Sequence, residues 1–248
     1  REEYGNPSSK YYAKAANAKS AVEDAREKVA MLLGAKHEEI IFTAGATEST
    51  NFIIKGYLDY RKYYGDGKNH IITSVVEHKA TLNTCRFLNG EIYSNADPTV
   101  SLFEENKRVD RGFEASFANV SSNGEVDPKS IEELIKPNTA MVSIIHVNNE
   151  IGTINDISGI SEICHTQDIA MHSDITQSLG KIPIDVKKLG IDYASCSAHK
   201  LYGPKGVGAA YLKADDYGIC PITAFLHGGE QEFGVRAGTL SVHNIVGF

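Results

Sequence analysis

The sequence feature that most constrains the fold is a series of short apolar runs that alternate with longer amphipathic segments. Three of the runs are apolar almost throughout, namely MVSIIHV at 141–147, IAMHSD at 169–174 and IDYASCS at 191–197. A strand has this composition when helices cover both faces of a parallel sheet. The alternation therefore predicts an α/β domain with a mainly parallel sheet flanked by helices.

Periodicity indicates further elements along the chain. Apolar residues recur at helical spacing from Ala21 to Leu33, and Gly34 follows where a helix is expected to end. Strands are also predicted at 39–45 and 70–76, and helices at 46–65 and from about 78 to 88. The stretch between Leu88 and Ser116 is charged and lacks clear periodicity, so it is predicted to be a solvated loop or insertion.

Length and charge exclude several classes of protein. The chain has 248 residues, which is enough to bury a sizeable core. Its net charge is −7, with 25 basic against 32 acidic residues, which argues against a nucleic-acid-binding surface. The apolar runs are shorter than the ~20 residues that span a bilayer, and no charged-then-apolar leader opens the sequence. We therefore expect a cytoplasmic protein without nucleic-acid or membrane partners.

Polar clusters follow five of the predicted strands. They read AGATES (44–49), EHKA (77–80), VNNEIG (147–152), SDITQS (173–178) and SAHK (197–200). In open α/β sheets, ligands bind at the carboxyl ends of the strands. The clusters are therefore predicted to converge on one site.

Asp174 and Lys200 carry the most specific chemistry. Asp174 ends an apolar strand, where a lone carboxylate is costly unless it meets a cation or several donors; the alternative is that it caps a helix start. Lys200 directly follows another apolar strand, so its amine is predicted to be partly desolvated, with a lowered pKa and raised nucleophilicity. A Schiff-base lysine with an aspartate on the pyridinium nitrogen is the pattern of pyridoxal phosphate (PLP) enzymes.

Two further positions have both a functional and a structural interpretation. Gly45, Ala46 and Thr47 stand at a strand-to-helix junction, where free N–H groups and the helix dipole favour a phosphate; alternatively, Thr47 only caps its own helix. His78 could stack on a cofactor ring or transfer a proton, or it could simply be hydrogen-bonded. Neither a P-loop nor a dinucleotide-binding glycine pattern is present.

Metal and disulfide chemistry are not indicated. The nine histidines show no helical H-x-x-x-H spacing, so no metal site is predicted. The four cysteines are widely spaced, which indicates neither a disulfide framework nor a zinc site. Reduced, buried thiols are expected at Cys85, Cys164, Cys196 and Cys220.

Taken in order, the motifs of this chain resemble those of a known family. They are YGNPSS (4–9), GATES (45–49), EHKA (77–80), HVNNEIG (146–152), HSDITQSLGKIPID (172–185), SAHKLYGPKGVGAAY (197–211), HGGEQE (227–232) and RAGT (236–239). The chain thus resembles the cysteine desulfurases of the NifS/IscS type, which are PLP enzymes of the class V aminotransferase family with the aspartate aminotransferase-like fold.

The resemblance implies a role for each matching residue. Lys200 would bind PLP as a Schiff base and later move a proton, Asp174 would pair with the pyridinium nitrogen, and His78 would stack on the ring. The other implied cofactor contacts are Asn149 and Gln177 near the phenolic oxygen, Ala46, Thr47, Ser197 and His199 at the phosphate, and Thr239 at the phosphate site of the partner subunit in a homodimer.

The implied reaction converts L-cysteine to L-alanine and passes sulfur, through a persulfide on an enzyme cysteine, to an acceptor such as an iron–sulfur scaffold protein. None of the four cysteines lies in the context of that catalytic cysteine. Residues 1–248 would then be the PLP-binding large domain, with the family's N-terminal segment and small C-terminal domain outside this chain. The alternatives are a related PLP lyase acting on selenocysteine and a non-catalytic scaffold with the PLP fold.

Overall fold

The computed structural model describes residues 5–9, 12–93 and 103–248. Its elements are α1 (Ala13–Leu33), the 3-10 turn η1 (His37–Glu39), β1 (Ile40–Thr43), α2 (Ala46–Tyr63), β2 (His70–Ser74), α3 (Lys79–Leu88), β3 (Glu91–Tyr93), β4 (Phe103–Arg108), β5 (Glu114–Ala118), α4 (Pro128–Glu132), β6 (Thr139–Ser143), α5 (Ile157–His165), β7 (Ala170–Asp174), β8 (Tyr193–Ser197), η2 (Ala198–Leu201), β9 (Gly208–Leu212), η3 (Glu232–Gly234) and α6 (Val242–Gly247).

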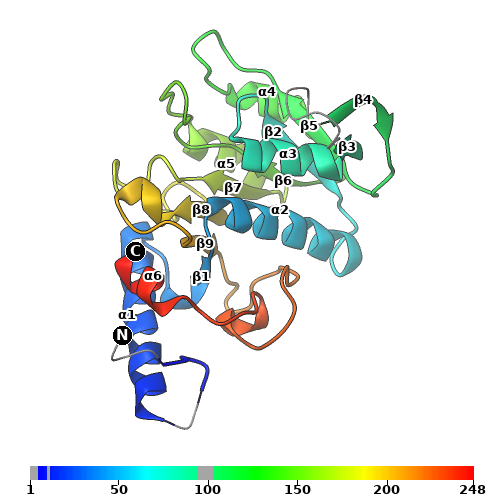
Figure 1. Cartoon of the computed structure of the whole chain (residues 1–248). Coiled ribbons are helices and arrows are strands. Elements are labelled where there is room, and N and C mark those ends of the chain that lie inside the picture. Colours follow the sequence, from blue (N-terminus) through cyan, green and yellow to red (C-terminus); the bar gives the residue numbers. More distant parts are fainter. Residues whose placement is uncertain (1–4, 10–11, 94–102) are drawn as a thin grey trace.

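The main sheet has seven strands in the order β1-β9-β8-β7-β6-β2-β5 (Figure 1). The four pairings from β8 to β5 are parallel, whereas β9 runs antiparallel to both β1 and β8. The predicted α/β class with a mainly parallel sheet is confirmed. The antiparallel strand β9 was not predicted, because its sequence GAAYL lies inside a glycine-rich motif that does not indicate the direction of a strand.

Both faces of the sheet are covered, so its central strands are buried throughout. All residues of β2, β6, β7, β8 and β9 are buried. On one face, Phe52, Ile53 and Leu58 of α2 pack with the apolar side of α3 and the sheet. On the other face, side chains of α1, α5 and α6 form a second cluster that includes Val29 and Ile160. The sheet therefore separates two hydrophobic layers.

The charged stretch between Leu88 and Ser116 is not only a loop. Strands β3 and β4 pair antiparallel as a small separate sheet, and β5 begins at Glu114. Figure 1 shows this pair of strands at the upper right of the molecule, beside β5. The sequence FEENKR of β4 contains one apolar residue, so backbone pairing rather than an apolar pattern defines the strand. Residues 94–102, which belong to the same prediction, lie outside the described residues.

Helix α1 ends as the sequence predicts. Gly34 has φ +68°, and its N–H reaches the carbonyls of Ala30 and Met31. The helix is also tied to the distant η3 turn, because Arg26 pairs with Glu232 (Nη2–Oε1, 2.7 Å) and both side chains are buried. Glu232 Oε2 also accepts the N–H of Phe42 at 2.6 Å, so one carboxylate joins α1, β1 and η3.

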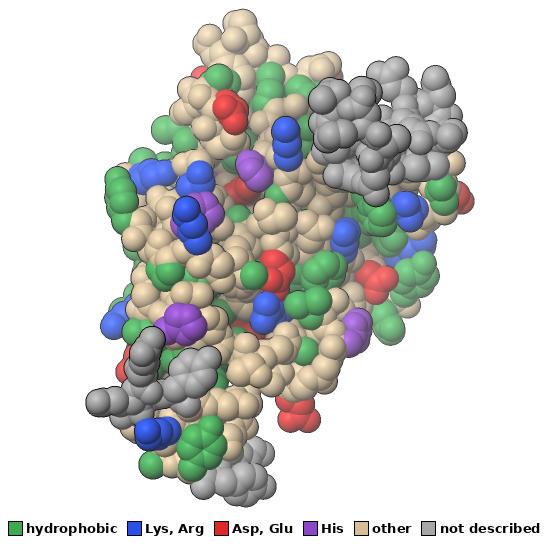
Figure 2. Space-filling view, viewed as in Figure 1, with side chains coloured by type: hydrophobic (Ala, Val, Ile, Leu, Met, Phe, Trp, Pro, Cys, Tyr) green, Lys and Arg blue, Asp and Glu red, His purple; other side chains and the backbone are tan. Residues whose placement is uncertain are grey.

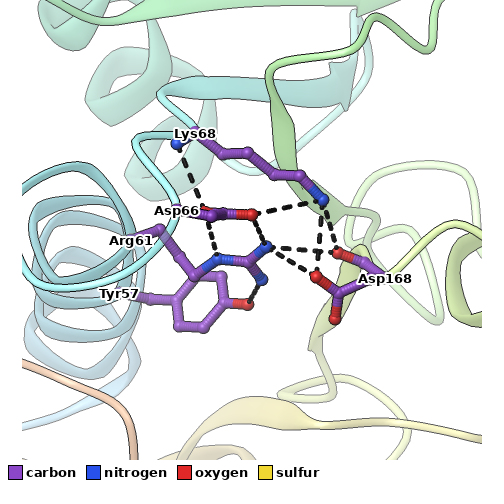
Figure 3. A network of polar contacts seen from close by, with 5 residues as sticks. All are labelled: Tyr57, Arg61, Asp66, Lys68 and Asp168. Atoms are coloured by element: carbon purple, nitrogen blue, oxygen red, sulfur yellow. Dashed lines mark hydrogen bonds and ion pairs between the residues drawn. The ribbon is translucent and has the colours of Figure 1, made fainter.

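A network of charged groups lies at the amino ends of the parallel strands (Figure 3). Arg61, near the end of α2, donates to Tyr57 Oη at 2.6 Å, to Asp66 Oδ2 at 2.7 Å and to Asp168 Oδ2 at 2.9 Å. Lys68 Nζ approaches Asp168 Oδ2 at 3.4 Å. These contacts hold the end of α2 against the segments that lead into β2 and β7.

On the surface, basic side chains lie singly or in small groups among the other residue types on the face shown in Figure 2. Within the described part of the chain, no helix combines the length and apolar character needed to cross a membrane.

Candidate active site

A cavity of about 460 Å³ opens at the carboxyl ends of the parallel strands. Its lining contains nine of the ten residues predicted from the sequence, and the tenth, Thr239, is not among them. The nine are Ala46, Thr47, His78, Asn149, Asp174, Gln177, Ser197, His199 and Lys200. The five polar clusters therefore do converge, as the order of strands and loops predicts.

Asp174 is the buried acid of the cavity. It is the last residue of β7, with 3% exposure, and its Oδ1 accepts the N–H of Thr176 at 2.9 Å. Burial raises the pKa of this carboxyl, and the hydrogen bonds from Thr176 only partly offset the effect. No ion pair involving Asp174 occurs in the described part of the chain. The site thus holds a carboxyl group that lacks a cation.

Lys200 lies across the cavity in η2, directly after β8. The turn that follows is held by two left-handed positions, Tyr202 at φ +65° and Gly206 at φ +80°. The prediction of a partly desolvated amine is wrong for this chain, because Lys200 is exposed. Tyr202, Lys205 and Gly206 in the following turn are exposed as well, so η2 and its turn lie at the surface of the chain.

The start of α2 forms the third wall. Gly45 caps the helix at φ +150° without a side-chain hydrogen bond, and Thr47 is exposed in the first turn. Thr47 is therefore not the capping residue of its helix. The N–H of Ala46 donates to Ser197 Oγ at 2.7 Å, which joins this helix start to the end of β8. The remaining N–H groups of the first turn can bind an anion, together with the hydroxyls of Thr47 and Ser197 and the imidazole of His199.

The side chain of His78 is hydrogen-bonded and also lines the cavity. Its Nδ1 accepts the N–H of Ala80 at 3.1 Å, so the ring caps α3, and the same side chain lines the cavity. Because Nδ1 accepts, the proton of the neutral ring lies on Nε2. The cap fixes the orientation of the imidazole.

The amide side chains are positioned by local contacts. Asn149 Nδ2 donates to Glu150 Oε1 at 2.8 Å, and Gln177 Oε1 accepts from Lys181 Nζ at 2.8 Å. The neighbouring Asn148, which the sequence reasoning missed, accepts two N–H groups of its own turn and donates to the carbonyl of Val76 at 2.9 Å. Its position in the NNE motif was the available signal.

Three residues that line the cavity were not predicted from the sequence. Ile145, Glu150 and Thr176 contribute to the cavity. Glu150 and Thr176 adjoin the predicted residues Asn149 and Gln177, so these two loops enter the site as short continuous segments, whereas Ile145 lies two residues past the end of β6.

Thr239 and its motif lie elsewhere. Thr239 is exposed, while Arg236 of the same RAGT segment donates from Nε to Glu48 Oε1 at 2.7 Å. This bond ties the segment to the first turn of α2. Thr239 is thus three residues from a side chain that is bonded to α2, but it does not line the cavity of its own chain.

The four cysteines do not take part in the cavity. Cys85, Cys164 and Cys196 are buried, Cys220 is half-buried, and none of them is bonded to another. Burial raises the pKa of all four thiols, to about 12 for Cys164, Cys196 and Cys220. Within residues 5–9, 12–93 and 103–248, no group of three His, Cys, Asp or Glu side chains could hold a metal ion.

Comparisons with known proteins agree with this geometry. The aminotransferase class-V family model matches residues 1–248. The chain is 46% identical over 245 residues to cysteine desulfurase IscS of Buchnera aphidicola, covering 99% of this chain and 54% of that protein. Among solved structures, "SspA in complex with cysteine" is 39% identical with a TM-score of 0.85, covering 99% of this chain and 63% of that one. A NifS-like protein is also 39% identical, with a TM-score of 0.83, covering 100% and 60%.

The chain spans about half the length of the curated relatives that it matches. The family model covers it from end to end, and the resemblance noted in the motifs is thereby confirmed. The chain belongs to the aminotransferase class-V family.

Proposed function

We propose that this chain is the PLP-binding large domain of a cysteine desulfurase, which converts L-cysteine to L-alanine and passes the sulfur to an acceptor protein. The observation that carries the proposal is Asp174, a buried carboxyl without a cation, facing a cavity that also holds a lysine amine and a helix N-terminus. The identity to curated cysteine desulfurases supports the choice of substrate.

The residues present fit PLP. The cofactor has a phosphate, a pyridine nitrogen and an aldehyde. The first turn of α2, with Thr47, Ser197 and His199, supplies donors for the phosphate. Asp174 supplies the anion that a protonated ring nitrogen needs, and Lys200 supplies the amine for covalent attachment.

Each residue then has a defined task. PLP, when bound, draws electrons from Cα of the substrate amino acid. Asp174 holds the proton on the ring nitrogen, which keeps that withdrawal strong. The imidazole of His78, fixed by its bond to Ala80, presents a flat face for the ring. Lys200 Nζ would take the proton from Cα of the substrate, and its exposed position leaves room for this movement.

Two parts of the function need groups from outside this cavity. The sulfur-accepting thiolate would be a residue other than the four cysteines of this chain, since none of them lines the cavity. The exposure of Thr239 supports a homodimer in which this residue contacts the partner's phosphate site. An iron–sulfur scaffold protein is the proposed sulfur acceptor.

The test is covalent trapping of the cofactor. The protein is incubated with PLP, reduced with borohydride and digested, and the modified peptide is identified by mass spectrometry. We expect one reduced PLP adduct on Lys200 and none in Lys200→Ala, with Lys205→Ala as the matched control that keeps the adduct. An adduct on another lysine, or an unchanged adduct in Lys200→Ala, would contradict the proposal. Alanine formation from L-cysteine by the protein expressed from its natural gene then tests the reaction.

A further inference from the structure

Glu77 is a buried acid that the proposed function does not use. It precedes His78 in the segment between β2 and α3, and only 6% of it is exposed. Its Oε1 accepts two hydrogen bonds, from Ser74 Oγ at 2.6 Å and from the N–H of Ile145 at 3.1 Å. Its Oε2 is also buried, yet has no hydrogen-bond partner among the residues that the structure describes. An unpaired buried oxygen of this kind calls for an explanation.

The two bonds place Glu77 between the ends of two neighbouring strands. Ser74 is the last residue of β2, and Ile145 follows β6 and lines the cavity. The carboxyl therefore connects the segment that carries His78 to the wall of the site. It lies behind the lining residues and does not itself line the cavity.

The charged and titratable groups around Glu77 explain its state. Burial and the charge of Asp174, on β7, raise the pKa of Glu77. Burial and the charge of Glu77 in turn raise the pKa of the Cys85 thiol on α3. Burial raises the pKa of that thiol, and burial lowers the pKa of His146, which follows Ile145, so both groups are neutral near pH 7. Next along the chain, His78 acts on Asp174 and favours its ionised form. None of the hydrogen-bond donors that reach Glu77 is charged.

Two buried carboxyl groups that influence each other do not both ionise readily. Asp174 faces the cavity, where a cationic ring nitrogen would favour its anion. Glu77 faces neutral donors only and has one oxygen free to carry a proton. Burial, with a smaller contribution from Asp174, raises the pKa of Glu77 to about 8.

We propose that Glu77 is a positioning residue that stays protonated, so that the negative charge of the two buried carboxyl groups rests on Asp174, while its bonds to Ser74 and Ile145 hold the His78 segment at the cavity. The role of Asp174 in this statement rests on the proposed function. The protonation of Glu77 does not, because it follows from the contacts of the chain itself.

The first experiment uses the cofactor-free protein. Infrared spectra near neutral pH are compared for the parent, Glu77→Gln and the control Glu132→Gln, which changes an exposed glutamate. We expect a protonated-carboxyl band in the parent and in the control, and its loss in Glu77→Gln. No difference between Glu77→Gln and the parent would overturn the proposal.

A second variant keeps the test decisive if Glu77→Gln does not fold. Ser74→Ala removes a hydrogen bond that favours the ionised form of Glu77, but keeps the carboxyl. The acid band should therefore persist to higher pH than in the parent. A transition that is unchanged or shifted to lower pH would overturn the proposal.

The last readout concerns the cofactor. Because Gln is a neutral isostere of the protonated acid, Glu77→Gln should bind PLP within about threefold of the parent, less than the tenfold that corresponds to 1.4 kcal/mol. A loss of about tenfold or more would show that an ionised Glu77 is needed and would overturn the proposal. If the parent binds no PLP, the proposed function fails, whereas the infrared result still decides the protonation of Glu77.

Discussion

Acidic side chains have opposite surroundings at the two ends of the parallel strands, which we call the amino edge and the carboxyl edge of the sheet. At the amino edge, Asp66 pairs with Arg61, and the buried Asp192 accepts from both His165 and Lys213 at 2.8 Å. At the carboxyl edge, Asp174 and Glu77 are buried with neutral donors alone. Pairing stabilises the first edge, whereas the second bears a desolvation cost that a cationic ligand would relieve. The difference separates a structural network from the proposed binding site.

The largest expected effect comes from neutralising Asp174 at the carboxyl edge. In Asp174→Asn, PLP affinity should fall by about thirty- to a hundredfold, because a charge-assisted contact worth about 2–3 kcal/mol is lost. The cofactor-free protein should nevertheless unfold at a higher temperature, since a buried amide is desolvated at lower cost than a carboxylate.

Spectroscopic titration with PLP and thermal unfolding of the same samples measure both effects. The matched control is Asp156→Asn, which changes an acid that caps α5 away from the cavity. Unchanged PLP affinity in Asp174→Asn, or a lower unfolding temperature, would remove the contrast between the edges.

A smaller effect is expected at the paired edge. Arg61→Met keeps the apolar stem of the side chain but removes its bonds to Tyr57, Asp66 and Asp168. The free energy of unfolding should fall by about 2 kcal/mol, because partly buried acceptors lose a charged donor. PLP affinity should not change, because the network lies at the opposite end of the strands. Denaturant unfolding and PLP titration of Arg61→Met check this pair of outcomes, and a variant that loses cofactor affinity would show that the edges are coupled.

The smallest effect concerns the dependence of stability on pH. The hydrogen bond from Arg61, together with its charge, holds the pKa of Asp66 well below its usual range. This contribution is present above the unfolded pKa of about 3.9 and is lost as the pH falls through the folded value. Asp66→Asn should therefore lose less than about 1 kcal/mol near pH 7 and should unfold less steeply in acid than the parent.

At the carboxyl edge, the dependence of stability on pH has the opposite sign. The raised pKa of Glu77, about 8, means that its contribution is complete at low pH and is lost as the pH rises from the unfolded value of about 4.3 toward 8. Measuring unfolding from acid to mildly alkaline pH in Asp66→Asn and Glu77→Gln compares the two slopes directly. Slopes of equal sign would contradict the distinction drawn between the edges.

Much of the fold could be predicted from local patterns. The end of α1 at Gly34 and the buried strands β6, β7 and β8 follow from periodicity and apolar runs. Polar residues directly after such strands must meet at one edge, so nine of the ten site residues were brought together. Their functional roles remain predictions.

The features that could not be predicted depend on which strands pair and on which segments cover a side chain. The reversal of β9 and the pairing of β3 with β4 depend on backbone partners, which periodicity cannot specify. The exposure of Lys200 depends on which segments cover it, and the strand before it carries no such information. The Arg61 network joins side chains up to 107 residues apart, and its charged members have the appearance of ordinary surface charges in the sequence.

The pairing of β1 has a consequence for the order in which the protein can be assembled during synthesis. Among the described strands, β1 bonds only to β9. The buried ion pair of Arg26, in the preceding helix, needs Glu232, which lies 206 residues later. A nascent chain that has emerged only as far as β8 leaves β1 and β8 with open hydrogen-bonding edges, which can pair with other chains. The segment from α1 to β1 is therefore expected to depend on chaperone protection until the ribosome has delivered Gly208–Leu212.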